Sequence, residues 1–537
     1  MASHILSALD AMKTQRYHFK TITIAGVGLF TDGYYLFCIP TMMRLVARTC
    51  YPNFSQIEEI LFDVPFIIAS TIISISLMGA VIGHVVFGRL GDRVGRVKIH
   101  RVTLVLIIVG SIGCEFSILI MSPSVLVSLV IFRFFLGIGI GGDYPLSGTV
   151  MSELANRRTR GGFVACVLSM QGFGMLFNSI VTMIVCSIFN VLVEKKQPSF
   201  QSENTVKVSP DSDLAWRLIF MTGAIPASLT YYWQMKMPET ARFTALIKNN
   251  PLQAAKDMEK VLNVSLSLIL EDIETISSPI TLVDYSYDLF SMEFLRRHGR
   301  DLIAASINRF LLDIVFYSLN LFQYHAFKHH TIAKNYNMDP YGVAMQVAVV
   351  QAIIAVCAVI PASFVTVFLI DYVGRVKIQA VGFFSMAICL FIMAKINKVN
   401  WGSETSGGFI MLYGLALFFS NCGPNTTTFV VPTELFPARF RATCHGISGG
   451  VGKVGAVIGT IGFLWASRDT PHVPDVSNVF SALGVVCTLG FFVTYFFSRE
   501  TMGRSLEDNE DVDELTGVWF VRFWPNKIWD KATQETL

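Results

Sequence analysis

The chain has 537 residues, of which 53% are hydrophobic and only 15% are charged, and its mean hydropathy is +0.53. Soluble proteins carry about 25% charged residues, so this composition excludes a set of soluble domains and indicates a membrane protein. The net charge of +3 is too small to indicate nucleic acid binding, and the ten cysteines show no C-x-x-C pair or metal-type spacing. We expect no metal and no cofactor.

The apolar segments, in chain order, predict a polytopic membrane protein. Residues 1–20 are polar, and the apolar run after them is too long for the core of a signal peptide, so we expect it to stay in the membrane. A spanning helix needs about 20 largely apolar residues. Twelve stretches meet this requirement, near 21–43, 66–91, 100–120, 124–145, 161–189, 215–236, 302–326, 341–370, 378–396, 408–431, 442–467 and 476–498. The predicted fold class is therefore all-α.

The twelve predicted spans fall into two groups of six on either side of a polar stretch. The expected organisation is an N-terminal segment at 1–20, a six-helix bundle at 21–236, a central loop at 237–301, a second six-helix bundle at 302–498 and a tail at 499–537. Lys and Arg concentrate in short segments on one side, with five of them within 89–101. By the positive-inside rule, the central loop and both termini are predicted to be cytoplasmic.

The two groups share sequence markers. "DRVGRVKI" at 92–99 recurs as "DYVGRVKI" at 371–378, and "ELANRRTRG" from Glu153 is echoed by "ELFPARFRAT" from Glu434. Such repetition predicts two parallel six-helix halves that share one cavity.

The first marker resembles the signature loop of the major facilitator superfamily. Its glycine permits a tight turn, its aspartate can accept hydrogen bonds from the amides of a helix start, and its arginines can pair with acidic groups of the neighbouring bundle. Ordinary topogenic charge is the alternative. The residues expected to form the gating loops are Gly88, Asp92, Arg93, Gly95 and Arg96, with Asp371, Gly374 and Arg375 in the second half.

Ionisable residues inside the predicted spans indicate a polar cavity. Each costs roughly 2.5–3.5 kcal/mol at the bilayer centre on insertion scales, so such residues face a cavity, a partner or a substrate. They are Asp32, Arg133, Asp143, Arg309, Asp313 and Lys453. Arg309, Asp313 and Tyr317 are spaced to share one helix face. Asn421 and Asn425 flank a Gly-Pro pair that weakens their helix. For each residue alone, a structural hydrogen bond or salt bridge is the alternative.

Several stretches closely resemble the plant-type high-affinity phosphate:proton symporters of the major facilitator superfamily. They are "GGDYPLSGTVMSELANRRTRG", "MPETARFTAL", "EFLRRHGRDL" and "NCGPNTTTFVVPTELFPARFRATCHGISGGVGKVGA", and the resemblance runs from "ALDAMKTQRYHF" to "GRSLE". It implies the major facilitator fold, with twelve transmembrane helices in two pseudo-symmetric halves, and a transporter rather than an enzyme.

The resemblance also implies residue roles. Proton coupling is implied for Asp32, Arg133 and Asp143, and phosphate contact for Tyr144, Gln171, Asp313, Tyr317, Asn421 or Asn425, and Lys453. The residue types suit this task, because a carboxylate beside a lysine can accept from a phosphate hydroxyl that sulfate lacks. No cationic residue lies within five positions of Asp143. We therefore expect a carboxylate without a fixed partner, able to take up and release a proton.

Two positions depart from the family pattern. Span 1 reads "TDGYYLF" where the family usually has "TDAYDLF", so Tyr35 replaces a second aspartate. Arg309 stands where the family usually has tryptophan. As a pocket modifier, Arg309 either pairs with Asp313 and disables it, adds a phosphate anchor, or extends toward the cytoplasm.

These observations predict proton-coupled import of H₂PO₄⁻ across the plasma membrane by alternating access, with arsenate as a competing substrate. A transport-weak or transport-silent phosphate receptor or assembly partner is one alternative, and a symporter of another inorganic anion is the other. The expected partners are inorganic phosphate, protons and the lipid bilayer, without nucleic acid; a homo- or hetero-oligomer stays open. Asn53 in "NFS" is an expected glycosylation acceptor on the outer side.

Overall fold

The described part of the chain is almost entirely helical. The computed structural model describes residues 16–50, 60–61, 64–115, 123–196, 210–262, 287–327, 340–397, 406–466 and 476–506. Besides helices and short connections, these residues contain one antiparallel pair of two-residue strands, β1 (Ile60–Leu61) and β2 (Val64–Pro65). The all-α prediction is confirmed. Asn53 and the tail beyond Leu506 lie outside the described residues.

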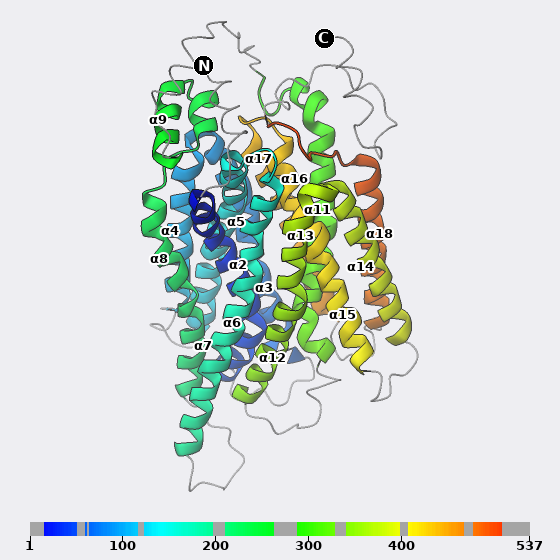
Figure 1. Cartoon of the computed structure of the whole chain (residues 1–537). Coiled ribbons are helices and arrows are strands. Elements are labelled where there is room, and N and C mark those ends of the chain that lie inside the picture. Colours follow the sequence, from blue (N-terminus) through cyan, green and yellow to red (C-terminus); the bar gives the residue numbers. More distant parts are fainter. Residues whose placement is uncertain are drawn as a thin grey trace, which may run out of the picture.

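The helices form two groups along the chain; in Figure 1 most of the first group lies on the left and most of the second on the right, while α12 and α17 lie against the first group. The first group comprises α2 (Arg16–Cys50), α3 (Phe66–Val94), α4 (Arg96–Glu115), α5 (Pro123–Leu154), α6 (Arg160–Lys196), α7 (Pro210–Thr222) and α8 (Ala224–Met235). The second comprises α11 (Met292–Phe327), α12 (Pro340–Ile354), η3 (Ala355–Val359), α13 (Ile360–Val373), α14 (Arg375–Asn397), α15 (Ser406–Ser420), η4 (Asn421–Asn425), α16 (Thr426–Leu435), α17 (Arg441–Ala466) and α18 (Val476–Phe497).

Along the chain, η1 (Phe243–Ile247) and α9 (Pro251–Leu262) come between the two groups, within the predicted central loop. The helix α11 also begins inside that stretch, at Met292. The end of the bundle that carries α9 also carries residues 498–506, the segment after α18, and it is the upper end in Figure 1. We call it the α9 end.

The helices have the length and composition of membrane spans. Within the described ranges, ten helical stretches are long and apolar enough to cross a bilayer. Two further predicted spans are each built from shorter helices: α7 and α8 meet at Gly223, and α15 and α16 are joined by the π-helical turn η4, which contains Pro424. Large apolar side chains such as Leu229 and Phe368 point outward, as expected of lipid-facing surfaces.

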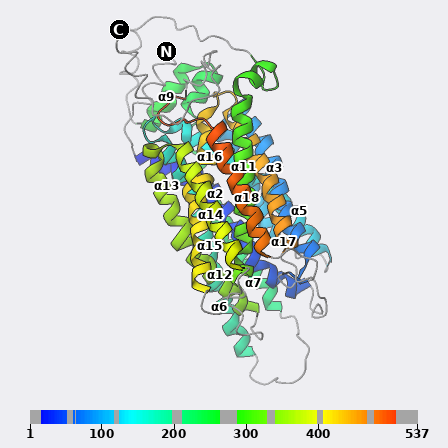
Figure 2. The same cartoon turned by 90° about the vertical axis from the view of Figure 1, so that its right-hand side faces the viewer.

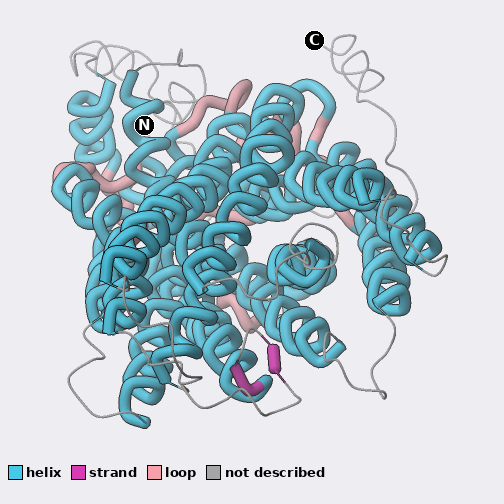
Figure 3. Tube along the Cα trace, turned by 90° about the horizontal axis from the view of Figure 1, so that it is seen from below, coloured by secondary structure: helices cyan, strands magenta, loops and turns pink. Residues whose placement is uncertain are grey.

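The two halves meet along helices that are distant in sequence. α3 packs along α17, and α6 packs along α12 and α13; Figure 2 shows α17 beside α3 and α5. A Cβ atom at Gly88 would lie 2.6 Å from the Ala442 carbonyl oxygen, and one at Gly446 would lie 2.2 Å from the His84 carbonyl oxygen. Only glycine permits this backbone contact between α3 and α17. Figure 3 shows the helices of both halves from the end opposite α9.

Candidate functional site

A buried polar cluster lies where α11 and α17 meet. Arg309, Asp313 and Tyr317 stack along one face of α11, as their spacing predicts, and all three side chains are buried. The Nε atom of Arg309 lies 3.1 Å from Oδ1 of Asp313. Lys453 reaches the same residues from α17: its Nζ lies 4.0 Å from Oδ2 of Asp313 and donates to the Tyr317 hydroxyl. We call these four side chains, with Asp32, the central cluster.

The position of Arg309 excludes one of the three alternatives for this residue. Its side chain is buried, so it does not extend toward the surface. Instead, Nη1 donates to Oγ1 of Thr428 at 3.1 Å and to Oδ1 of Asn425 at 3.4 Å. Pairing with Asp313 and anchoring an anion both remain compatible with this geometry, because the guanidinium has donors beyond those it uses on Asp313.

The interrupted span places Asn425 at the cluster and Asn421 one turn away. Asn425 donates to Oδ1 of Asn421 at 3.0 Å, and Asn421 donates to the Leu417 carbonyl at 2.9 Å. The predicted break is present, since Pro424 lies in η4 and the Asn421 carbonyl accepts from Oγ1 of Thr426 at 2.8 Å. Asn425 is thus the direct contact of Arg309, while Asn421 positions Asn425.

Asp32 and Tyr144 bring the first half to the central cluster. Asp32 accepts from Nε2 of Gln171 at 3.0 Å and lies within electrostatic range of Lys453, Arg309 and Asp313. The Tyr144 ring lies 5.0 Å from the guanidinium carbon of Arg309 and 5.8 Å from Nζ of Lys453. Both halves therefore contribute to one buried group of two cations and two carboxylates.

Asp143 does not have the unpartnered position that the sequence predicts. Its Oδ1 lies 2.7 Å from Nε2 of His100 on α4, and both side chains are buried. Its carboxylate also packs against Gly28 of α2, where a Cβ atom would lie 1.7 Å from Oδ2. The expectation of a carboxylate without a fixed partner was wrong, because the partner comes from another helix. Asp143 directly precedes Tyr144, whose ring contacts the central cluster.

Arg133 and Tyr35 lie together, away from these contacts. Arg133 is buried, its guanidinium carbon is 5.8 Å from the centre of the Phe220 ring, and its electrostatic neighbours include Tyr35, Cys38 and Cys114. The Tyr35 hydroxyl donates to the Phe220 carbonyl at 3.2 Å. The proton-coupling role that the resemblance implies for Arg133 stays a prediction.

The gating loop of the first half joins the two halves at the α9 end. Asp92 accepts from the backbone amides of Ala442 and Thr443 at 3.2 and 2.7 Å, at the start of α17. Exposed amides and the helix dipole make this a favourable place for a carboxylate. Arg96 lies 3.2 Å from Asp92 and 3.3 Å from Glu153, which is also 3.0 Å from Arg441 of the other half.

The second half repeats this arrangement. Asp371 accepts from the amide of Gly162 at the start of α6, at 2.8 Å, and Arg375 lies 2.9 Å from Asp371 and 2.8 Å from Glu434. The loop glycines have positive φ angles, +138° at Gly95 and +101° at Gly374, a conformation that favours glycine. Arg93 is exposed, whereas Gly88 belongs to the close contact of α3 with α17.

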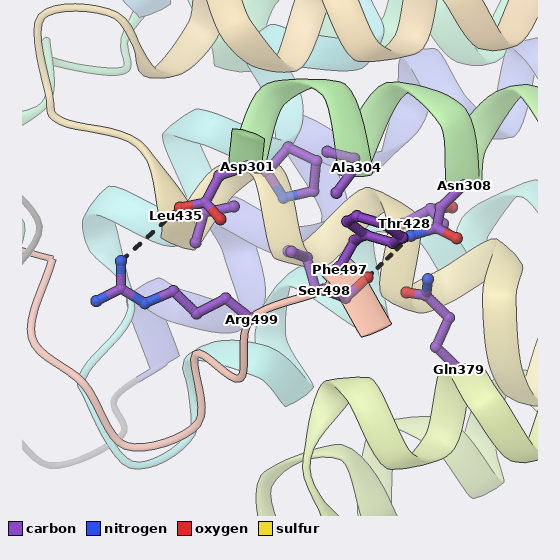
Figure 4. Close-up of a pocket in the computed structure, with 12 residues that line it drawn as sticks. Asp301, Ala304, Asn308, Gln379, Thr428, Leu435, Phe497, Ser498 and Arg499 are labelled. Carbon is purple, nitrogen blue, oxygen red and sulfur yellow. Dashed lines mark hydrogen bonds and ion pairs between the residues drawn. The ribbon is translucent and has the colours of Figure 1, made fainter. Parts of the chain in front are cut away.

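A small cavity lies inside the second half, between α11, α14 and α16. Its volume is about 10 Å³, room for about one water molecule. Figure 4 shows its polar groups meeting one another: Nδ2 of Asn308 donates to Oγ of Ser498 at 2.9 Å, and Arg499 lies 3.8 Å from Asp301. Gln379 donates to Thr494 at 2.9 Å. These contacts hold helix ends together, and the cavity is too small for an oxyanion.

Sequence reasoning missed several residues that the structure brings to the site. Thr428, His84 and His445 surround Arg309 or Tyr144, and Glu153 and Glu434 complete the gating loops. In the sequence, the two glutamates were noted only as the first residues of the second pair of repeated markers, without a role. No periodicity marks Thr428 or the histidines, since their neighbours come from other helices.

The chain is similar to named transporters over nearly its whole length. The family model described as "Sugar (and other) transporter" matches residues 21–512. The probable inorganic phosphate transporter 1-9 of Arabidopsis thaliana is 51% identical over 523 residues, 94% of this chain and 95% of that protein. The low affinity inorganic phosphate transporter 3 of Petunia hybrida is 44% identical over 529 residues, 96% of each chain.

Solved structures agree on the fold. The proton:xylose symporter XylE bound to 6-bromo-6-deoxy-D-glucose has a TM-score of 0.69 at 18% identity, covering 93% of this chain and 99% of its own. A partially occluded inward-open conformation of XylE from E. coli has a TM-score of 0.64 at 19% identity, covering 91% and 100%. The chain therefore belongs to the sugar (and other) transporter family of the major facilitator superfamily, as a multi-pass membrane transporter grouped with the plant inorganic phosphate transporters.

Proposed function

We propose that the chain imports inorganic phosphate, as H₂PO₄⁻, across the plasma membrane together with protons. The observation that carries this proposal is the buried central cluster, in which Arg309 and Lys453 face Asp32 and Asp313. Isolated charges are not retained in a membrane interior without a partner or a substrate. The names of the plant relatives add support for phosphate as the anion.

The residue types of the cluster suit a protonated oxyanion. Lys453 and Arg309 supply positive charge, and Tyr317 and Asn425 supply neutral hydrogen-bonding groups. Asp313 can accept from a phosphate hydroxyl, a contact that sulfate cannot make. Sulfate offers no donor to this carboxylate, so it would lose a hydrogen bond to a charged group, worth about 1.5–3 kcal/mol, and meet the negative charge of Asp313 instead. Arsenate has the shape and hydroxyl groups of phosphate and is therefore proposed as a competing substrate.

Proton coupling follows from the charge balance of the cluster. Arg309 and Lys453 balance Asp32 and Asp313 when both carboxylates are ionised. A bound H₂PO₄⁻ adds one negative charge, and a buried net charge is costly. One proton taken up by a carboxylate of the site restores the balance, so proton and phosphate enter together.

Alternating access then requires that the two halves open at one end at a time. Asp92 accepts from Thr443 and Glu153 pairs with Arg441, so these contacts link the two halves at the α9 end, and they would break when that end opens. We assign this end and both termini to the cytoplasm, on the basis of the Lys and Arg distribution.

Uptake of radiolabelled phosphate by cells that lack their own phosphate carriers tests the proposal. We expect uptake that is faster at acidic than at neutral external pH, that arsenate inhibits, and that sulfate and nitrate leave unchanged. Asp313→Asn should reduce uptake at least tenfold, about 1.4 kcal/mol. Uptake that ignores external pH, or that sulfate blocks as well as arsenate, would contradict the proposal.

The ion pair between Arg309 and Asp313 supports a second candidate. If the 3.1 Å pair keeps Asp313 from phosphate, the chain is a transport-silent phosphate receptor or assembly partner. Phosphate then binds the purified protein, but cells that display the protein at their surface accumulate none. Measuring binding and uptake on the same preparation separates the two candidates.

A further inference from the structure

His100 and Asp143 form a buried pair that sequence reasoning did not anticipate. Nε2 of His100 lies 2.7 Å from Oδ1 of Asp143, and the two side chains are 2% and 1% exposed. The other ring nitrogen of His100, Nδ1, is also buried and has no hydrogen-bond partner among the described residues. A histidine with one nitrogen on a carboxylate and the other unsatisfied can both receive and pass on a proton.

The pair occupies the space between the gating loops and the central cluster. On α4, His100 lies one turn after Arg96, which contacts Asp92 and Glu153 at the α9 end. On α5, Asp143 directly precedes Tyr144, whose ring faces Arg309 and Lys453. A proton on this pair therefore lies between the central cluster and the contacts of Arg96 at the α9 end.

Other charged groups near this level are held by contacts of their own. Asp32 on α2 accepts from Gln171, and His84 on α3 has Nδ1 2.7 Å from the Ala80 carbonyl. Asp92 and Arg96 contact each other, and Arg101 donates to the carbonyls of Gln234 and Met237. Among the described residues, His100 is thus the side chain placed to exchange a proton with Asp143.

We propose that His100 relays the proton between Asp143 and the α9 end. In this step the O–H bond of the Asp143 carboxylic acid breaks and an N–H bond forms at Nε2 of His100. The neutral acid and neutral imidazole become a carboxylate–imidazolium pair, so the net charge of the buried pair does not change. When the α9 end opens, the imidazolium releases the proton on Nδ1 to water. One proton moves, and no oxidant or reductant takes part.

A neutral exchange of this kind matters in a membrane interior. A lone carboxylate that loses its proton leaves an isolated buried charge, whereas the pair distributes one proton between two sites and behaves as a single unit. His100 acts here through Asp143, as a positioning and relay residue. The inference rests on the proposed function, because it names the proton route of that transport.

The test uses the full-length protein in liposomes and measures two activities. One is phosphate accumulation driven by a pH gradient, and the other is exchange of labelled for unlabelled phosphate at equal pH, which needs no net proton movement. In His100→Gln a neutral amide takes the place of the imidazole beside Asp143, and this amide cannot carry a proton. We expect exchange within about twofold of wild type, driven accumulation at least about tenfold lower, and a flattened dependence on pH.

His298→Gln is the matched control, since His298 is a buried histidine bonded to Tyr287 outside the pair and the central cluster. It should keep both activities. If His100→Gln retains driven accumulation with the wild-type pH profile, or loses exchange and accumulation equally, the relay inference is wrong. If wild-type protein exchanges phosphate but shows no response to a pH gradient, proton coupling in the proposed function fails instead.

Discussion

At the scale of single residues, Arg309 decides the charge balance of the central cluster. It lies 3.1 Å from Asp313, while Lys453 lies 4.0 Å away on the other carboxylate oxygen. Removing one partner of a buried ion pair leaves an uncompensated charge, which is more costly than the pair itself was favourable. Replacing Arg309 should therefore change both the affinity for phosphate and the pH dependence of transport.

Arg309→Gln should weaken phosphate binding and shift transport to more acidic pH. The variant leaves two carboxylates against Lys453 alone, so one additional proton is needed to restore neutrality before an anion binds. Loss of a charged hydrogen bond, about 1.5–3 kcal/mol, corresponds to a rise in KM of about tenfold or more. Uptake kinetics at several external pH values measure both effects.

Arg300→Gln provides the comparison, because Arg300 is an exposed arginine on the same helix. It should leave KM and the pH profile unchanged. Faster uptake in Arg309→Gln than in wild type would mean that Arg309 disables Asp313 rather than anchoring phosphate.

Gly28→Ala should disturb proton coupling without adding or removing charge. A Cβ atom at Gly28 would lie 1.7 Å from Oδ2 of Asp143, so the carboxylate must shift, which changes its 2.7 Å contact with His100. We expect gradient-driven phosphate accumulation to fall at least about tenfold. Gly462→Ala is the control, since a Cβ atom added there has no other atom within 4 Å. Equal accumulation in the two variants would argue against a fixed Asp143 position.

Residue chemistry was predictable from sequence, but residue pairing was not. The cost of membrane charges identified Asp313 and Lys453, and helical spacing placed Arg309 beside Asp313. Asp143 and Tyr144 differ by about 100° around their helix, so they face different neighbours. His100 lies in a basic stretch whose charge is accounted for by the positive-inside rule, and nothing in the sequence related His100 to Asp143.

At the scale of helices, the interrupted spans shape the site. α15 and α16 are joined by η4, and Gly423 lets this turn approach α14 so closely that a Cβ atom would lie 2.7 Å from Cα of Gly382. The Gly-Pro pair predicted this break. The start of α11 was harder to predict from the sequence, because Met292 lies in a polar stretch without the apolar pattern of a span.

Gly423→Ala should separate η4 from α14 and displace Asn425 from Arg309. Forcing an additional methyl group into tight packing costs about 1–3 kcal/mol. We expect a lower unfolding temperature in detergent and a raised KM for phosphate. Gly414→Ala on α15, where nothing lies within 4 Å of the added atom, should match wild type in both measurements. An unchanged KM would show that Asn425 does not depend on this turn.

At the scale of the whole molecule, the two halves are joined by related contacts that differ in their number of hydrogen bonds. Asp92 accepts from two backbone amides and from Oγ1 of Thr443 at the start of α17. Asp371 accepts from the amide of Gly162 at the start of α6. The repeated sequence markers predicted both loops, but not this inequality, which depends on how each helix start meets the opposite half.

The inequality predicts that Asp92→Asn opens the α9 end more than Asp371→Asn does. Asparagine keeps one accepting oxygen and loses the charge that the helix start and Arg96 favour, worth about 0.3–1 kcal/mol at the helix terminus alone. Spin labels at Arg158 and Met502, exposed positions at the α9 end in opposite halves, report the distance between the halves. We expect the longer-distance population to grow in the order wild type, Asp371→Asn, Asp92→Asn, and the reverse order of the two variants would show that the second-half loop is the stronger fastening. Because the α9 end must open to release substrate and close to recapture the outward-facing state, the variant that opens most should exchange phosphate yet accumulate least.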